Sequence, residues 1–251
     1  MKNVLLSAVN LSKTFSSEDK SVLKDVTVDF YEGDFTVIMG SSGAGKSTLL
    51  HVLSGMDRAS SGKVVYKGQE IQEIREKQMA KLRTCEFGFV FQQTHLVSNL
   101  SLYENIAVAG YLGNKTQPKM TQEMVKELLT QMNLGSAGDR LPSEVSGGEA
   151  QRAAVARAVI NRPAIVFADE PTGALNRQNT EDVLNILSRL SQAGQSILMV
   201  THDLRAALRG NRILYLDDGQ ITGEMELPVY ESGTAKEREA RLNSWLSSME
   251  W

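Results

Sequence analysis

One stretch of the sequence decides the fold: Gly40-Ser41-Ser42-Gly43-Ala44-Gly45-Lys46-Ser47-Thr48. It fills the pattern G-x-x-x-x-G-K-[ST], in which glycines let consecutive backbone N–H groups point at one anion. A strand is expected before it, over Phe35–Met39, and a helix after it, over residues 48–53, whose positive end also faces the anion. This context predicts a loop that binds the phosphates of ATP. Lys46 would reach the β- and γ-phosphates, and the Ser47 hydroxyl would hold Mg²⁺.

A second chemical signal closes an apolar strand expected over residues 165–168, which ends in Asp169 and Glu170. A buried parallel strand delivers its last residues to the edge of the sheet where ligands bind. There Asp169 is suited to hold Mg²⁺, and Glu170 to orient or deprotonate a water that attacks the γ-phosphate. Alone, the two carboxylates would rather predict an acidic helix start. Together with the loop at residues 40–48, they predict ATP hydrolysis.

The expected elements fall into three groups. Early strands over residues 4–9, 26–30, 35–39, 63–66 and 87–91 lie close together with short connections, which predicts an antiparallel part. Residues 95–160 are predicted to be mainly helical. After residue 160, strands over 165–168, 196–200 and 212–216 alternate with helix-length segments, as in a parallel sheet covered by helices.

A further helix is expected from Thr234 to the end of the chain. Thr234 and Glu237 fit a capping box at its start. One apolar stripe runs along it, and we expect this stripe to dock on the core of the chain itself rather than on a membrane. Its members are Leu242, Trp245, Leu246 and Met249.

Composition narrows the class of protein. The 251 residues carry 41% hydrophobic and 23% charged side chains, as in an ordinary globular protein. The net charge of −3 does not favour a nucleic-acid partner. The single cysteine, Cys85, cannot form an internal disulfide, and we expect it to be a small buried apolar residue. We expect neither a signal peptide nor a membrane span, because no apolar run approaches about 18 residues.

Additional motifs resemble those of ATP-binding-cassette (ABC) proteins, in the order that this family has them, as far as about residue 225. The glutamine loop of the family resembles Phe91-Gln92-Gln93, and its signature resembles Val145-Ser146-Gly147-Gly148-Glu149-Ala150-Gln151-Arg152. Its acidic strand with the D-loop resembles Ala168-Asp169-Glu170-Pro171-Thr172-Gly173-Ala174-Leu175-Asn176. Its switch histidine resembles Thr201-His202-Asp203. The sequence around Gln92 and Glu170 is similar to the corresponding sequences in ATPase subunits of lipoprotein-release, macrolide-export and antimicrobial-peptide-resistance transporters.

The resemblance implies a fold and a division of the chain. The fold would be α/β: a P-loop nucleotide-hydrolase core with an N-terminal antiparallel β subdomain and a helical subdomain. An ABC ATPase domain would span residues 1–225, with the helical subdomain at about 95–160. Residues 226–251 would form a C-terminal helical extension.

The resemblance also implies roles for individual residues. Catalysis would rest on Lys46, Gln92, Glu170 and His202, and Mg²⁺ would be held by Ser47, Gln92 and Asp169. ATP would be held by residues 40–48, with the ring of Phe15 stacked on adenine. A core position for Phe15 is nearly as compatible with the sequence.

The signature adds a second phosphate-binding surface. Ser146, Gly147 and Gly148, followed by Glu149, offer a hydroxyl, bare amides and a helix N-terminus. One γ-phosphate does not need two complete cradles from one chain, and in the family each signature faces the ATP of the other subunit. The resemblance therefore implies a homodimer around two Mg-ATP. Taken alone, the stretch would also fit a simple capped helix start. Asn176 replaces the usual aspartate of the D-loop, so its role stays open.

The implied function is that of an ATPase that drives a transmembrane permease on another chain, at the inner face of the cell membrane. Its cargo would be a lipophilic or peptide substrate that is exported or removed. An alternative is the motor of a transporter-like complex that regulates cell-wall enzymes and moves no cargo. A cassette ATPase acting on ribosomes or DNA is disfavoured, since such proteins usually have two cassettes or long inserted coils. A purely nucleotide-gated binding module would not need Glu170 and His202.

Overall fold

Two long strands open the chain, β1 (Val4–Thr14) and β2 (Ser21–Tyr31). They pair antiparallel, with Leu6 opposite Phe30, and β1 pairs on its other side with β4 (Ser61–Tyr66), which pairs with β5 (Gln69–Glu70). The computed structural model describes residues 2–15, 21–113 and 117–249. Within it the chain forms two units: unit 1 is residues 1–79 with 190–251, and unit 2 is residues 80–189.

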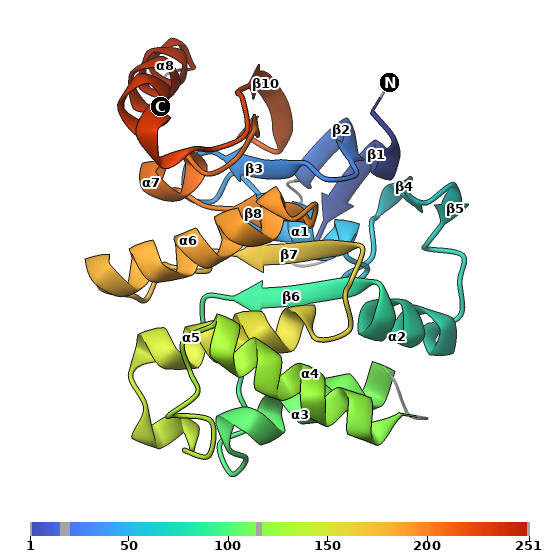
Figure 1. The fold of residues 1–251 in the computed structure, drawn as a ribbon. Coiled ribbons are helices and arrows are strands. Elements are labelled where there is room, and N and C mark those ends of the chain that lie inside the picture. Colours follow the sequence, from blue (N-terminus) through green and yellow to red (C-terminus); the bar gives the residue numbers. More distant parts are fainter. Residues whose placement is uncertain (1, 16–20, 114–116, 250–251) are drawn as a thin grey trace. The chain divides into compact units, whose positions relative to one another are not determined.

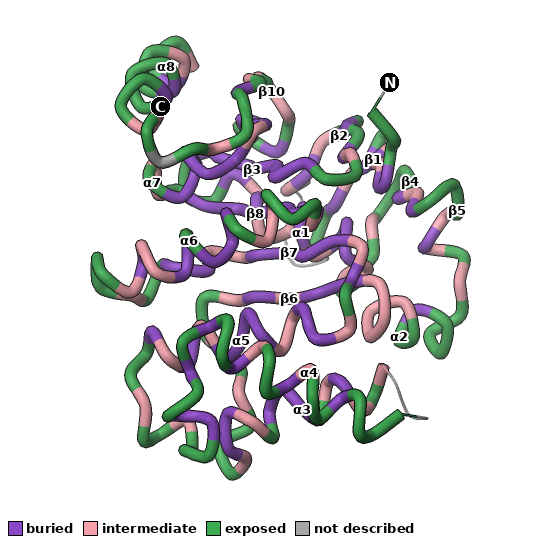
Figure 2. Tube along the Cα trace, in the orientation of Figure 1, coloured by how far each residue is buried: buried purple, intermediate pink, exposed green. Residues whose placement is uncertain are grey.

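Unit 1 contains a second sheet, centred on β3 (Phe35–Met39) (Figure 1). β3 pairs in parallel with both β8 (Ser196–Val200) and β9 (Arg212–Asp217), and β10 (Gln220–Glu226) pairs antiparallel with β9. All five residues of β3 and of β8 are buried, and Figure 2 shows them in purple. Short helices accompany this sheet: α1 (Lys46–Leu53) and α7 (Leu204–Ala207).

Unit 2 pairs β6 (Phe87–Phe91) in parallel with β7 (Ile165–Asp169). Its helices α3, α4 and α5 pack against one another, as the prediction of a helical stretch between residues 95 and 160 requires. The helical elements of this part of the chain are α2 (Glu76–Cys85), α3 (Leu102–Gly113), α4 (Pro118–Gln131), η1 (Pro142–Glu144), α5 (Gly147–Val159) and α6 (Arg177–Gln192).

The assignment of β3 and β6 to an antiparallel part is wrong, because both pair in parallel. Short connections suggested antiparallel neighbours, but these strands pair with partners that lie more than 70 residues further along the chain. The burial of β3 and β6 indicates parallel pairing better than the length of their connections does. Strands that are apolar along their whole length fit a parallel sheet covered on both faces.

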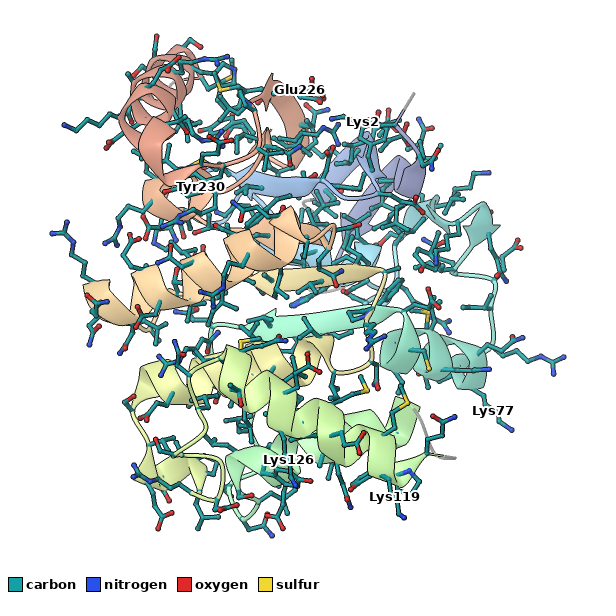
Figure 3. The ribbon with its side chains drawn as sticks, viewed as in Figure 1. Lys2, Lys77, Lys119, Lys126, Glu226 and Tyr230 are labelled. Atoms are coloured by element: carbon teal, nitrogen blue, oxygen red, sulfur yellow. The ribbon has the colours of Figure 1, made fainter. Side chains whose placement is uncertain are left out.

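The C-terminal segment adds η2 (Ser232–Thr234) and α8 (Ala235–Ser248) to unit 1. The apolar stripe docks as predicted: Leu242 and Leu246 are buried, and the Trp245 ring meets that of Tyr215 on β9. The capping box at Thr234 is wrong, because its hydroxyl donates to the carbonyl of Glu231. Near this segment Lys2 bridges Asp34 and Glu226, the latter at the end of β10 (Figure 3). Among the described residues no helix is long and apolar enough to cross a membrane.

Candidate active site

The loop at residues 40–48 joins β3 to α1 and depends on glycine at specific positions. Gly40, Gly43 and Gly45 have φ values of 152°, 82° and 102°, a region that other residues rarely adopt. A Cβ on Gly40 would lie 2.0 Å from the carbonyl oxygen of Leu216 in the neighbouring strand. Only glycine therefore allows the chain to leave β3 so close to β9 and curl into a loop.

Lys46 lies inside this loop. Its side chain is 9% exposed, and its Nζ donates to the carbonyls of Gly40 at 2.9 Å and Ser41 at 2.8 Å. The helix α1 begins at Lys46, two residues earlier than expected, and its N-cap is Gly45, which has no side chain to cap the helix. A buried ammonium group beside a helix N-terminus fits the phosphates of a nucleotide.

His202 leaves the same edge of the sheet as the loop. Ile38 of β3 is in register with Val200 of β8, so Gly40 and His202 each follow a paired residue by two positions. The N–H of Thr201 also donates to the carbonyl of Ile38, at 3.2 Å. The His202 side chain is exposed, and the next residue, Asp203, caps α7. Unit 1 thus places the histidine and the phosphate loop at one edge of two adjacent parallel strands.

Phe15 is exposed rather than part of the core, with 40% of its surface accessible. The Nζ of Lys13 lies 4.8 Å from the centroid of the Phe15 ring, and it also bonds Asp57 Oδ1 at 2.7 Å. A core position for Phe15 is therefore wrong. One face of the ring meets a cation held by a carboxylate, and the exposed remainder can receive a base.

Gln92, Asp169 and Glu170 lie at neighbouring strand ends of unit 2. Phe91 of β6 is in register with Asp169 of β7, so Gln92 and Glu170 are the next residues on each strand. An amide oxygen and a carboxylate at adjacent strand ends are ligands that suit Mg²⁺. The backbone of Glu170 has φ 46°, and its carbonyl accepts the N–H of Gly173 at 3.0 Å.

The signature residues open α5 with the predicted cap. Ser146 Oγ accepts the N–H of Glu149, and Glu149 Oε2 accepts both the N–H and the Oγ–H of Ser146, at 2.8 and 2.7 Å. These bonds hold the pKa of Glu149 below its ordinary value. Gly148 packs on Asn179, because a Cβ there would lie 2.3 Å from the Asn179 amide. Asn176 Oδ1 accepts the N–H of Asn179 at 2.9 Å at the start of α6, which leaves its amide N–H groups as donors.

Comparison with known proteins identifies the family. The family model described as ABC transporter matches residues 23–173. The chain belongs to the ABC transporter family. Two curated relatives are both macrolide export ATP-binding/permease proteins MacB. The one from Acinetobacter baylyi is 39% identical over 95% of this chain and 36% of its own length. The one from Wolinella succinogenes is 37% identical over 94% and 37%. The chain thus spans little more than a third of these relatives.

Solved structures of the cassette MJ0796 confirm the fold of this ABC ATPase. One shows the dimeric post-hydrolysis state bound to ADP and Pi, at 32% identity and a TM-score of 0.82. The other shows a dimer of this bacterial ABC transporter cassette, at 33% identity and a TM-score of 0.80. Each match covers 90% of this chain and 100% of the other. The α/β P-loop fold is confirmed, and the chain is an ATPase whose substrate is ATP and whose metal is Mg²⁺.

Two contacts of this ABC ATPase were not predicted from the sequence. Gln151 Nε2 donates to the carbonyl of Phe91, just before Gln92, at 2.8 Å. Arg157 donates to the carbonyls of His95 and Thr94, just after it, at 2.6 and 2.7 Å. Burial lowers the pKa of the Arg157 guanidinium. Both side chains come from α5, so this helix binds the backbone just before and just after Gln92. The sequence signal that could have predicted these contacts is the presence of long polar residues within an alanine-rich helix.

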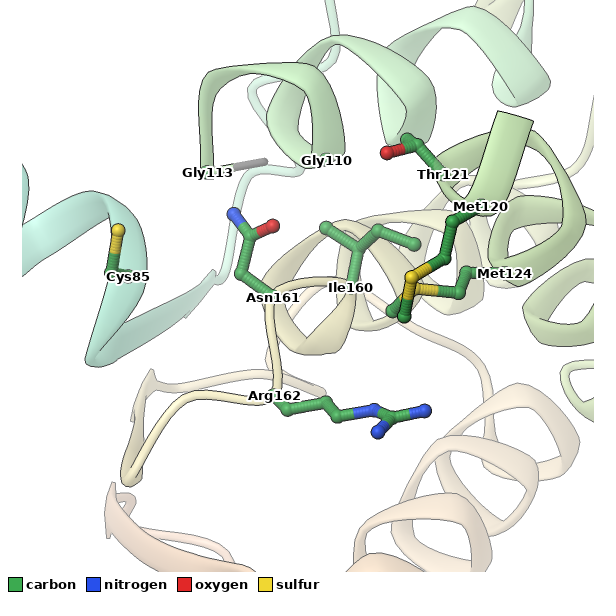
Figure 4. Close-up of a pocket in the computed structure, with 9 residues that line it drawn as sticks. All are labelled: Cys85, Gly110, Gly113, Met120, Thr121, Met124, Ile160, Asn161 and Arg162. Carbon is green, nitrogen blue, oxygen red and sulfur yellow. The ribbon is translucent and has the colours of Figure 1, made fainter. Parts of the chain in front are cut away.

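A pocket of about 190 Å³ lies elsewhere in unit 2, beside α3, α4 and the end of α5 (Figure 4). It holds none of the predicted site residues. Cys85 is half-buried on its wall, so the expectation of a fully buried cysteine is wrong. The remaining lining consists of five apolar or glycine residues and three polar ones: Gly110, Gly113, Met120, Met124 and Ile160, and Thr121, Asn161 and Arg162.

Proposed function

We propose that two copies of this ABC ATPase close around two Mg-ATP molecules and that hydrolysis reopens them, driving a transmembrane permease. One observation carries the proposal. Each unit places predicted site residues at the carboxyl ends of paired parallel strands: the loop at residues 40–48 with His202 in unit 1, and Gln92, Asp169 and Glu170 in unit 2. Ligands of open α/β sheets bind at the carboxyl ends of the strands.

Binding of ATP would begin in unit 1. The N–H groups of residues 40–48 surround the phosphates, and Lys46 exchanges its bonds to the loop carbonyls for the β- and γ-phosphate oxygens. The exposed ring of Phe15 stacks on adenine. Ser47, Gln92 and Asp169 would hold Mg²⁺, which when bound neutralises charge that develops on the β- and γ-oxygens.

Hydrolysis would then depend on Glu170. Its carboxylate orients the attacking water and accepts a proton from it. Gln92, on the adjacent strand end, would contact the same water or the metal. His202 donates a hydrogen bond to the γ-phosphate and distinguishes intact ATP from the cleaved state. The lid that excludes bulk water from the phosphates would come from the partner copy.

The partner's contribution is the signature. Ser146, Gly147, Gly148 and Glu149 begin a helix whose amides suit a second anion contact. Since Lys46 and its loop already supply one cradle, the signature would face the ATP of the second copy. Asn176, whose oxygen is used at the start of α6, would offer its amide N–H groups across the dimer. The dimeric MJ0796 structures support this arrangement.

The transport role rests on the relatives. MacB proteins are described as macrolide export ATP-binding/permease proteins, which supports export of a lipophilic or peptide substrate over a complex without cargo. The ATPase would then work at the inner face of the membrane, held there by the permease. Affinity purification from cells should recover a multi-span membrane protein with this chain. Recovery of cell-wall enzymes with no transported substrate would favour the regulatory alternative.

Substitution of Glu170 tests the hydrolytic assignment. The Glu170→Gln variant should bind ATP with unchanged affinity yet lose turnover by at least ~10²-fold, because glutamine cannot accept the proton of the water. Phosphate release and equilibrium binding of a fluorescent ATP analogue measure the two properties. Glu123→Gln, an exposed change on α4, is the matched control. A normal hydrolysis rate in Glu170→Gln would show that the assignment is wrong.

A further inference from the structure

A buried arginine links the C-terminal helix to the rest of unit 1. Arg238 is 3% exposed, and its guanidinium donates to three backbone carbonyls, those of Leu208, Gly210 and Pro228. Arg238 lies one turn before Leu242 and two turns before Leu246, on the buried face of α8. A buried guanidinium is costly unless its donors are matched, and the fork geometry of arginine can serve several acceptors at once.

Two of those carbonyls belong to the segment that follows His202. The four-residue helix α7 begins at Leu204 and ends at Ala207, and Leu208 and Gly210 continue its last turn. A helix this short is not stable by itself, so it depends on contacts at its ends. Asp203 caps its start, and Arg238 binds the carbonyls at its end.

The same segment rests on the strand that leads into the phosphate loop. Asn211 donates its N–H to the carbonyl of Phe35 at 3.0 Å, and its side-chain oxygen accepts the N–H of Phe35 at 2.6 Å. A Cβ on Gly210 would lie 2.9 Å from that carbonyl. Residues 204–211 are thus held between β3 on one side and Arg238 on the other.

Aromatic and apolar contacts hold Arg238 itself in place. The ring of Tyr230 lies 4.3 Å from the guanidinium carbon of Arg209 and 5.6 Å from that of Arg238. Leu242 and Leu246 are 0% and 1% exposed, which anchors the rest of α8. In Figure 1 α8 lies close to α7 and β10. Arg238 therefore contacts the end of α7 from a helix whose apolar face is buried in unit 1.

We propose that Arg238 is a positioning residue for the hydrolytic reaction: through the end of α7 it holds His202 at the edge where the γ-phosphate is bound. The inference rests on the proposed role of His202. It assigns the C-terminal segment, which follows the last strand of the core, a part in turnover. Loss of the guanidinium would leave the carbonyls of Leu208 and Gly210 without this donor, so the α7 end would loosen and His202 with it.

A double-mutant cycle tests this coupling in the purified chain. Arg238→Ala should lower kcat about 10-fold and leave the KM for ATP within about 2-fold, because the phosphate loop is intact. Arg238→Lys should retain part of the rate, since an ammonium group can bond fewer of the carbonyls. In the His202→Ala background, neither substitution should lower kcat further. Arg241→Ala, an exposed change on the same helix, is the control.

The possible results separate the inference from the function on which it rests. A His202→Ala variant with full kcat would overturn the proposed role of His202. A slow His202→Ala variant in which Arg238→Ala lowers kcat by a further 10-fold would overturn the positioning role and leave the function standing. If Arg238→Ala does not fold, the cycle with Arg238→Lys decides. Full kcat in Arg238→Lys together with a reduced melting temperature would also count against the inference.

Discussion

The turn that follows β7 depends on the backbone geometry of two residues, Glu170 and Gly173. Glu170 adopts a left-handed backbone with φ 46°, which costs a non-glycine residue about 1–3 kcal/mol. The hydrogen bond from Gly173 N–H to its carbonyl closes the turn. Gly173 in turn meets the side chain of Gln92, since a Cβ there would lie 3.0 Å from Nε2. The two strand ends are in contact through this glycine.

The Gly173→Ala variant should therefore disturb Gln92. The added methyl group would push the Gln92 amide aside by a few tenths of an ångström, and we expect the Mg²⁺ concentration for half-maximal hydrolysis to rise roughly 3-fold or more, because one oxygen ligand is misplaced. A Mg²⁺ titration of the ATPase rate measures this. Gly135→Ala, where a Cβ would meet nothing within 4 Å, is the control. An unchanged titration curve would show that Gln92 does not bind the metal or that Gly173 does not position it.

Single residues differ in how much the sequence could predict of them. The loop at residues 40–48 and the pair Asp169–Glu170 follow from residue type and spacing, because phosphate and metal binding allow few alternatives. Gln151, Arg157 and Arg238 did not follow. Each is a polar side chain on a helix face, which usually points to solvent. Only the fold shows that carbonyls of a distant segment meet them.

Among the elements, α5 begins with residues that both cap the helix and form the proposed signature. Its cap at Ser146 uses both directions of a capping box, and the same residues are the proposed signature. The pKa of Glu149 is lowered first by the backbone N–H of Ser146 and then by its hydroxyl. A carboxylate whose pKa is lowered by folding stabilises the folded state when the pH is above the ordinary pKa of the group. This contribution is lost as the pH falls through the lowered pKa.

Removal of the cap should thus have a pH-dependent effect. Ser146→Ala should lower the free energy of unfolding by about 1 kcal/mol at pH 7, because α5 loses its N-cap. The difference from the unsubstituted chain should shrink as the pH falls below 4.5, the ordinary value for this carboxyl group, since Glu149 becomes neutral in both proteins. Urea unfolding between pH 7 and 3 measures it, with the exposed Ser136→Ala as control. A difference that stays constant over this range would rule out the Glu149 contribution.

Elements were easier to place than to pair. The strand ranges from the sequence lie within the observed strands or match them, because β-branched residues and turn signals are local. Pairing is not local: β3 joins β8 and β9, which lie far along the chain. Likewise the stripe of α8 was visible in the sequence, but the Thr234 hydroxyl is satisfied by Glu231 and not by the predicted cap.

At the scale of the whole molecule, the residues of the proposed site come from both units of the chain, and the signature would serve a second copy. The division into residues 1–225, with a helical part at about 95–160, and an extension at 226–251 stays a prediction. Contacts within unit 1, including those of Arg238 and Trp245, show that the C-terminal segment is packed on the core. A motor built from two such chains needs only a few kcal/mol between its open and closed states.

Mixing two inactive variants tests whether the signature acts across a dimer. Lys46→Ala removes the cradle and Ser146→Arg blocks the signature, so each variant alone should be inactive. An equimolar mixture should recover about a quarter of the normal rate, because half of the dimers are mixed and each has one intact site of two. Phosphate release measures it, and a mixture of Lys46→Ala with the exposed Lys126→Ala, which should give half the normal rate, is the control for dilution. Energy transfer between two fluorescently labelled copies reports exchange of subunits. A mixture of the two inactive variants that stays inactive while subunits exchange would place the signature in cis.

The structure of the Glu170→Gln variant with bound Mg-ATP is the most direct test of the account. We predict the γ-phosphate within hydrogen-bonding distance of Lys46 Nζ, with the residue-170 side chain and His202 of the same chain directed at it and Ser146 of a second copy on the opposite side. A nucleotide bound away from Lys46, or a residue-170 side chain turned from the γ-phosphate into the protein interior, would contradict the account.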